Sequence, residues 1–344
     1  MTEQQAQHTE NKTSPVISIS GICSELVGSF LIFIAIYLVS ALSPSLYGPS
    51  AILVAAATGL AYAAMTFVFG RFSGGQFNPA VTLAAMLVSK IGIVNGICYI
   101  VAQVVGAIAA GGVAKLVLPT SKAAPARMWF ANAVNGYDKG SISATQLQQA
   151  GVSFGILFAV VVEVIATIIV VAASLRAIDD DGKATANAAA IMGVAYALGV
   201  TFTYPVTGSS LNPARATGIA IFANNAGLAT HPLQQLWIFW ICPILAAAIV
   251  AIVVIIAQMI SSKNSEDAEA LDVTADWEQE DAQSENGSAD DDESADAEKS
   301  DDFQMPSLTE SEIPSETTDE PKPENDATVE SPQNEESQTD TDKD

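Results

Sequence analysis

Histidine and cysteine are rare in this chain of 344 residues, and their scarcity argues against two kinds of site. Two histidines, His8 and His231, are too few for a multi-histidine metal site. The three cysteines, Cys23, Cys98 and Cys242, are odd in number and lie in apolar runs, which disfavours a disulfide scaffold. The sequence shows no grouping of a nucleophile with a base that would indicate catalysis. We therefore predict neither an enzyme nor a bound metal or cofactor.

Charge is also scarce, except at one end of the chain. Residues 1–262 hold 10 Lys/Arg and 8 Asp/Glu, whereas residues 263–344 hold 4 Lys and 30 Asp/Glu. Because no basic face is present to neutralise phosphates, nucleic acid is not a predicted partner. The acidic segment has too few apolar residues to bury a core, so we predict a disordered tail. Such a tail is either a solvated extension or a docking segment for a cytosolic partner.

The chain contains long apolar runs that are almost free of charged residues. Six segments of about 20 residues or more hold at most one charged residue each, and roughly 20 helical residues cross a hydrocarbon core of about 30 Å. Lipid offers the backbone no hydrogen bonds, so the spans must be helices. Six such runs disfavour the alternative, buried helices of a soluble protein. The spans are about 22–42, 51–70, 91–113, 152–175, 186–206 and 233–260.

The spans divide the chain into a polar segment over 1–20, a six-span region over 21–262 and the acidic tail over 263–344. The first segment has no basic start followed by an apolar run, so we see no secretory signal peptide. A modest bias of basic residues favours the side that holds both termini. We predict a multi-pass protein of the plasma (cytoplasmic) membrane, surrounded by lipid, with both termini in the cytoplasm.

The six-span region contains a repeat, over about 22–118 and 151–260. In the first half Glu25 lies 53 residues before Asn78-Pro79-Ala80, and in the second half Glu163 lies 49 residues before Asn212-Pro213-Ala214. Each tripeptide follows a Gly/Ser stretch. Because each half holds three spans, the second half enters the membrane upside down relative to the first. Transporters and channels with such inverted repeats place their site at the midplane.

Each tripeptide predicts the start of a short helix. Asparagine is a preferred N-cap, and proline is favoured at the first helical position. The two helices, Pro79–Leu87 and Pro213–Phe222, are too short to span the membrane. Entering from opposite faces, they bring their positive N-terminal dipole ends together at mid-membrane. Irregular backbone at that depth must line a cavity or be buried in protein.

The two loops carry a family resemblance. Residues 73–82, SGGQFNPAVT, and residues 208–215, GSSLNPAR, resemble the signature loops of the aquaporin, or major intrinsic protein, family. Residues 103–107, QVVGA, resemble the family's pattern in the third span. The resemblance covers about 22–260 and omits the tail. Many members have histidine two places before the first asparagine, where this chain has Gln76.

The resemblance implies an all-α membrane fold of six spans and two half-helices, with a narrow pore through each protomer of a homotetramer. It implies that Asn78 and Asn212 donate side-chain N–H groups to the passing molecule, while Arg215 and the helix dipoles repel cations and protons. Glu25 and Glu163 are implied to accept hydrogen bonds from backbone donors and brace the loops. A proton relay is the alternative role for carboxylates within a membrane, and their symmetric placement favours bracing.

The family's spacing places a selectivity constriction at Thr58, Val200, Ser209 and Arg215. Water-selective members typically have an aromatic residue at the first position and histidine at the second. Glycerol-conducting members have aromatic residues at the first and third positions and glycine at the second. This chain has neither set. Its small side chains predict a wider opening that admits neutral solutes such as glycerol or urea.

Residues outside the constriction favour a water channel instead. Ala216 and Ala220 stand where glycerol-type members have Asp and a basic residue, and the sixth span contains Phe239-Trp240. Because size and hydrogen-bond partners at the constriction set the barrier, we predict a passive channel for water and small neutral solutes that excludes ions and protons. A water-only pore is one alternative. A coupled secondary transporter, with the two membrane carboxylates as coupling groups, is another.

Overall fold

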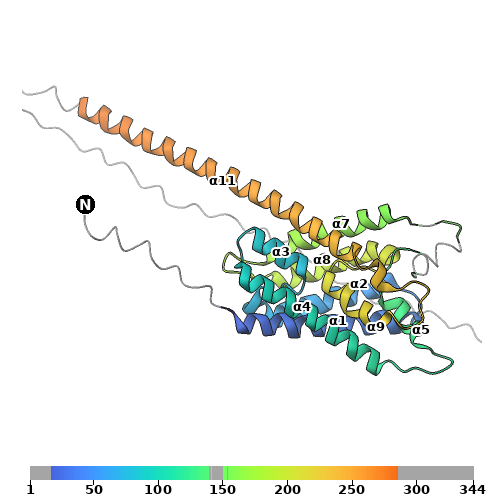
Figure 1. Ribbon diagram of the computed structural model, residues 1–344. Coiled ribbons are helices and arrows are strands. Elements are labelled where there is room, and N and C mark those ends of the chain that lie inside the picture. Colours follow the sequence, from blue (N-terminus) through green and yellow to red (C-terminus); the bar gives the residue numbers. More distant parts are fainter. Residues whose placement is uncertain (1–16, 139–140, 142–149, 153, 286–344) are drawn as a thin grey trace, which may run out of the picture. The chain divides into compact units, whose positions relative to one another are not determined.

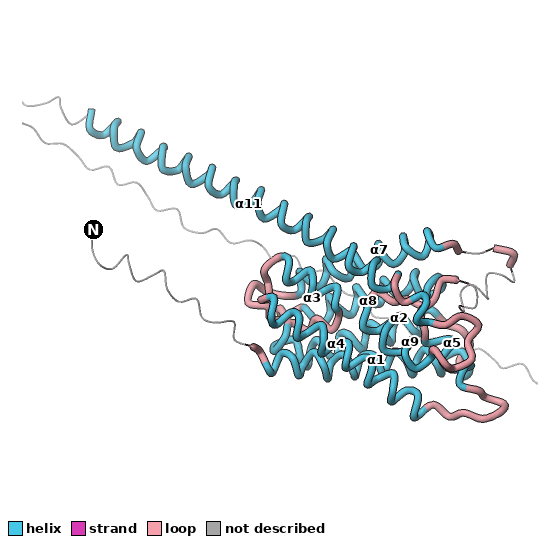
Figure 2. The backbone as a smooth tube through the Cα atoms, in the orientation of Figure 1, coloured by secondary structure: helices cyan, strands magenta, loops and turns pink. Residues whose placement is uncertain are grey.

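The computed structural model describes residues 17–138, 141, 150–152 and 154–285. The described residues form helices and loops, and a single isolated bridge, Ile178 to Ala184, is their one extended pairing (Figure 1, Figure 2). The chain divides into two compact units, Met1–Gln279 and Glu280–Asp344. The helix bundle and the site below belong to the first, and residues 280–285 of the second are described as the end of a helix. The helices are α1 (Ile19–Leu46), α2 (Ala51–Ser73), α3 (Pro79–Leu87), α4 (Ile93–Val117), α5 (Ala126–Ala133), α7 (Ile156–Ala177), α8 (Ala188–Thr207), α9 (Pro213–Ala223), α10 (Pro232–Gln235) and α11 (Ile238–Glu285).

Six helical stretches are long and apolar enough to cross a membrane, which confirms the six predicted spans. They are α1, α2, α4, α7, α8 and the stretch Pro232–Asn264. Large apolar side chains stand on their outer surfaces; Phe67 is 83% exposed and Leu116 is 84% exposed. An apolar surface of this extent suits lipid rather than water. The fold is therefore that of an all-α integral membrane protein.

The two short helices begin at the predicted asparagines. The Oδ1 atom of Asn78 accepts from the N–H of Ala80 at 2.9 Å, and that of Asn212 accepts from the N–H of Ala214 at 2.9 Å. A proline follows each cap, at the first helical position. Figure 1 places α3 toward the end of the bundle where α1 begins, and α9 toward the end that holds α5. The repeat is thus inverted, as the three-span halves predict.

The halves approach closely where α2 packs against α8. A methyl group on Gly59 would collide with the backbone oxygen of Gly193, so only glycine allows this crossing. Small residues at crossings are how membrane helices bring their backbones together. The crossing places the next turns of α2 and α8, with Tyr62 and Tyr196, face to face.

Two segments extend the helix content beyond the sequence prediction. Helix α11 continues to Glu285, so residues 263–285 are helical where we predicted the first part of a disordered tail. This stretch holds neither proline nor glycine, and prolonging a formed helix is far easier than starting one. The other segment is α5, a short helix within the connection 119–150. Residues 1–16 and 286–344, with the rest of the predicted tail, lie outside the described residues.

Candidate functional site

Asn78 and Asn212 hold the two loops together where α3 and α9 begin. Nδ2 of Asn78 donates to the carbonyl oxygen of Leu211 at 2.9 Å, and Nδ2 of Asn212 donates to that of Phe77 at 2.7 Å. Each asparagine therefore caps its own helix through its oxygen and binds the opposite loop through its nitrogen. The contact is reciprocal, so neither loop can move without breaking a buried hydrogen bond to the other.

The residue before each asparagine has a left-handed backbone. Phe77 has a φ of 47° and Leu211 a φ of 51°. Non-glycine residues avoid this region, and holding one there costs of order 1–3 kcal/mol. Both carbonyls accept the reciprocal asparagine bonds, which accounts for the strained turn at the same place in both loops.

Glu25 accepts hydrogen bonds from the first loop. Its Oε1 takes the N–H of Gln76 at 3.0 Å, and its Oε2 takes the N–H of Phe77 at 2.6 Å. Nε2 of Gln103 on α4 donates to Oε2 at 2.7 Å. The carboxylate is wholly buried, and all its bonds run to groups that shape the loop. Gln76, at the place of the family's histidine, points its amide back to the carbonyl oxygen of Ser73 at 3.1 Å.

Glu163 repeats this arrangement in the second loop. Its Oε1 takes the N–H of Ser210 and its Oε2 the N–H of Leu211, each at 2.9 Å. The hydroxyl of Thr207 donates to Oε1 as well. Glu163 is also wholly buried. In both halves, one carboxylate satisfies two successive backbone N–H groups that would otherwise lack partners away from water.

Two tyrosines lie directly against the asparagines. Nδ2 of Asn78 donates to the hydroxyl of Tyr196 at 2.9 Å, and Nδ2 of Asn212 donates to the hydroxyl of Tyr62 at 2.8 Å. Their rings are stacked, with centroids 3.3 Å apart and planes 7° apart. Sequence reasoning missed this pair. Its signal was spacing, since each tyrosine lies 16 residues before the asparagine of its own half.

The four predicted constriction residues line one cavity, together with both tyrosines. Thr58, Val200, Ser209 and Arg215 come from α2, α8, the second loop and α9, and each is 3–4% exposed. The hydroxyl of Thr58 donates to the carbonyl oxygen of Val54 at 2.7 Å, which leaves its oxygen able to accept. The hydroxyl of Thr203 donates its one hydrogen to the carbonyl oxygen of Gly199 at 2.7 Å, so the hydroxyl of Ser209, 2.8 Å away, donates to Thr203 and keeps its own oxygen able to accept.

Arg215 is positioned by a residue that sequence reasoning also missed, Asn135 in the connection 119–150. Nη1 of Arg215 donates to Oδ1 of Asn135, and Nδ2 of Asn135 donates to the carbonyl oxygen of Thr207 at 3.3 Å. The backbone oxygen of Arg215 accepts from the hydroxyl of Tyr37 at 2.6 Å. No motif marks Asn135, because only the folded connection brings it to the arginine.

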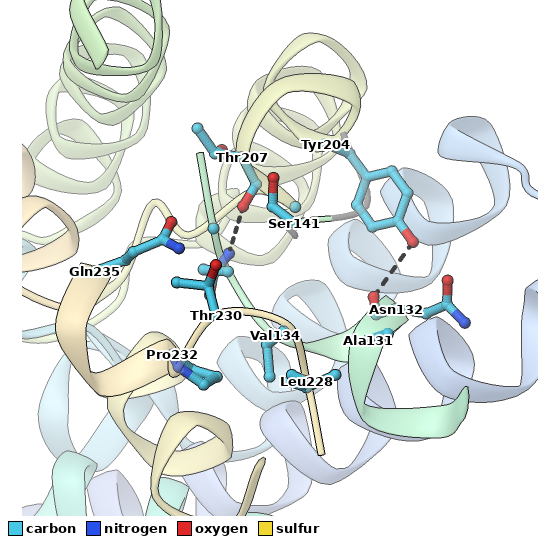
Figure 3. A pocket seen from close by; sticks show the side chains of 13 residues that line it. Ala131, Asn132, Val134, Ser141, Tyr204, Thr207, Leu228, Thr230, Pro232 and Gln235 are labelled. Atoms are coloured by element: carbon cyan, nitrogen blue, oxygen red, sulfur yellow. Dashed lines mark hydrogen bonds between the residues drawn. The ribbon is translucent and has the colours of Figure 1, made fainter. Parts of the chain in front are cut away.

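A second pocket lies beside this contact. It is lined by residues of 131–136, the end of α8 and residues 228–235, and Figure 3 shows Asn132, Tyr204 and Gln235 around it. Oε1 of Gln235 accepts the backbone N–H groups of Tyr137 and Asp138 at 2.7 and 3.2 Å. The connection is thereby anchored over the end of the bundle that holds Arg215.

The family model described as major intrinsic protein matches residues 12–254. The chain belongs to the major intrinsic protein family. Members of this family are channels and not enzymes, so the protein is a multi-pass membrane channel for water or small solutes.

Relatives within the major intrinsic protein family match most of the bundle. Aquaporin Z of Brucella melitensis is 32% identical over 210 residues, which are 58% of this chain and 80% of that protein. The lens fiber major intrinsic protein of Gallus gallus is 32% identical over 237 residues, 67% of this chain and 78% of that protein. The solved aquaglyceroporin of Plasmodium falciparum has a TM-score of 0.53 at 20% identity, covers 69% of this chain and 93% of its own, and shares the fold.

Proposed function

We propose that this channel passes water and small neutral solutes such as glycerol, and excludes ions and protons. The pore runs past Thr58, Val200, Ser209 and Arg215 to the paired motifs Asn78-Pro79-Ala80 and Asn212-Pro213-Ala214. Similar proteins include one named as an aquaporin and one named as an aquaglyceroporin, which fit the water and the glycerol of this proposal.

One observation carries the proposal: the four constriction positions meet at one cavity, and three of them, Thr58, Val200 and Ser209, present small side chains there. Val200 offers only methyl groups, whereas Thr58 and Ser209 add hydroxyls that can bond a polyol. None of the four is aromatic or a histidine, so nothing at these positions narrows the opening to a single water. A solute that carries several hydroxyls finds bonding partners at Thr58, Ser209 and Arg215, and apolar contact at Val200.

Charge at the cavity supports the exclusion of cations. The guanidinium of Arg215 lines it, and the N-termini of α3 and α9 bring partial positive charges to the asparagines. A cation that enters must lose water in a positively charged, buried environment, whereas a neutral solute meets only the hydrogen-bonding groups.

The two buried carboxylates support a passive pore rather than a coupled carrier. Glu25 and Glu163 each accept hydrogen bonds on both oxygens from loop N–H groups and neighbouring side chains, and neither lines the cavity. We assign both a bracing role. A carrier needs a titratable group that meets the substrate or the coupling ion, and these positions do not provide one.

The organisation we propose follows the sequence divisions. Residues 21–262 form the channel, in repeats of about 22–118 and 151–260, between the polar segment 1–20 and the acidic tail 263–344. We propose that the channel is a homotetramer in the plasma membrane with both termini in the cytoplasm. The tail is either a solvated extension or the docking segment for a cytosolic partner.

Stopped-flow light scattering on proteoliposomes tests the proposed function. An impermeant osmolyte should cause fast shrinkage, and glycerol should cause shrinkage followed by re-swelling. Shrinkage without re-swelling would establish the water-only alternative. Glycerol flux that saturates and depends on a proton or sodium gradient would establish a carrier instead.

A further inference from the structure

We propose that Tyr62 and Tyr196 form the narrowest point of the pore and that a permeating molecule must replace their hydroxyls on Asn78 and Asn212. This inference rests on the proposed function, since it places the decisive barrier within that pore. It moves the limiting step away from the four constriction positions to a tyrosine pair that lines the same cavity.

The pair is built symmetrically by the repeat. Each tyrosine lies three residues after the glycine of the α2–α8 crossing, Gly59 or Gly193, and 16 residues before the asparagine of its own half. Each hydroxyl nevertheless accepts from the asparagine of the other half. Each ring therefore reaches from its own half to the asparagine of the other half, at which a half-helix begins.

The tyrosines engage the one side-chain hydrogen of each asparagine that the opposite loop does not use. A carboxamide nitrogen carries two hydrogens. One hydrogen of Asn78 is engaged by the carbonyl oxygen of Leu211 and the other by the hydroxyl of Tyr196. Asn212 divides its hydrogens in the same way, between Phe77 and Tyr62. Neither asparagine keeps a hydrogen for a passing molecule until a tyrosine hydroxyl leaves.

The rings also fill the space. Their centroids lie 3.3 Å apart in nearly parallel planes, and each tyrosine is 1% exposed. Carbon atoms in contact are about 3.5–4.0 Å apart, so no molecule passes between the two faces. The cavity lined by the four constriction residues is bounded by this stack. Passage requires a ring to turn away, and turning breaks its hydrogen bond to the asparagine.

The chemistry of the replaced group defines the class of solute that this step favours. A phenol hydroxyl accepts from the amide through oxygen. Water and alcohols present the same acceptor, so they can take over the bond as the ring leaves, whereas a solute without such an oxygen leaves a buried N–H unpaired, which is costly. We therefore expect the tyrosine pair to favour hydroxylic solutes and to hold the wild-type rate, though faster than that of protein-free vesicles, below the rate of a variant that lacks the rings.

The test replaces both rings with a smaller side chain. The double variant Tyr62→Leu, Tyr196→Leu should raise the water permeability of proteoliposomes at least about tenfold, because passage no longer breaks two hydrogen bonds. The double variant Tyr62→Phe, Tyr196→Phe keeps both rings and should gain less than the leucine pair. Tyr204→Leu is the matched control, since Tyr204 lies on α8 but lines the pocket of Figure 3 and should leave the rate at its wild-type value.

Single variants guard against a fold defect in the double one. Tyr62→Leu and Tyr196→Leu alone each keep one ring, and each should give a smaller gain of similar size. Unfolding temperature in detergent establishes that the proteins compared are folded. Water permeability equal to wild type in every folded leucine variant would overturn the inference, as would a phenylalanine pair that conducts better than the leucine pair.

The two readouts separate this inference from the proposed function. If wild-type vesicles re-swell in glycerol but the leucine variants have the water permeability of wild type, the proposed function holds and the tyrosine constriction is overturned. If the leucine variants have a higher water permeability than wild type but wild-type vesicles never re-swell in glycerol, the tyrosine constriction holds and the proposed solute range is overturned.

Discussion

The two halves of the channel share a scaffold but differ at two positions that line the cavity only in the second half. Both loops have a buried glutamate on two backbone N–H groups, a left-handed residue before the asparagine and an asparagine bonded to the opposite loop. Three places after the asparagine, however, the first half has Val81 and the second has Arg215. Three places before it, the first half has Gly75 and the second has Ser209. Duplication therefore accounts for the framework, and we propose that departures from it determine selectivity.

The largest expected effects come from breaking the shared framework. Glu25→Ala and Glu163→Ala should each lower the free energy of unfolding by about 3 kcal/mol or more, because each leaves two buried backbone N–H groups unpaired at about 1–3 kcal/mol apiece. Unfolding of both variants in detergent measures this. A large loss for one variant and none for the other would show that the braces are not equivalent.

The next test makes the second half like the first. Arg215→Val gives both loops a valine three places after the asparagine, and it should raise proton or cation leakage by at least about tenfold, since a charge a few ångströms away contributes several kcal/mol at intermediate dielectric. A pH-sensitive dye trapped in proteoliposomes reports the leak. Arg71→Val, at the exposed end of α2, is the control. An unchanged leak in Arg215→Val would remove the arginine from the barrier to ions.

The smallest expected effect concerns the strained serine. Ser209 has a φ of 55° where its counterpart Gly75 has a φ of 69°, so Ser209→Gly should relieve strain and stabilise the fold by up to about 1 kcal/mol. The same change removes a hydroxyl from the cavity and should slow glycerol by about twofold, the worth of a weak neutral hydrogen bond. Stability and glycerol flux are read from the same preparation. A variant that is both less stable and equally permeable would contradict this account of Ser209.

Sequence reasoning reached the framework because its signals are local and repeated. The six spans, the two short helices and the paired tripeptides each follow from apolar run length or capping preference, and α3 runs from Pro79 to Leu87 as predicted. The four constriction positions came from the family's spacing, and the structure brings them to one cavity.

The missed features depend on contacts between distant segments. Asn135 meets Arg215 across 80 residues, so no local pattern reports that bond. Each tyrosine stands at a repeated spacing from the asparagine of its own half but bonds the asparagine of the other half, so the spacing marks the residue and not its contact. The helical stretch 263–285 was missed for another reason. Its acidic composition disfavours a packed core but not a helix that continues one already formed.

The most direct test of the account compares glycerol re-swelling in wild-type and Val200→His proteoliposomes. Thr201→His serves as the control, because the neighbouring Thr201 is exposed and lies off the cavity. We predict that wild-type and control vesicles shrink and then re-swell, whereas Val200→His vesicles shrink as fast in an impermeant osmolyte but lose most of the glycerol phase. Wild-type vesicles that never re-swell, or Val200→His vesicles that re-swell at the wild-type rate, would contradict the claim that this constriction admits small neutral solutes.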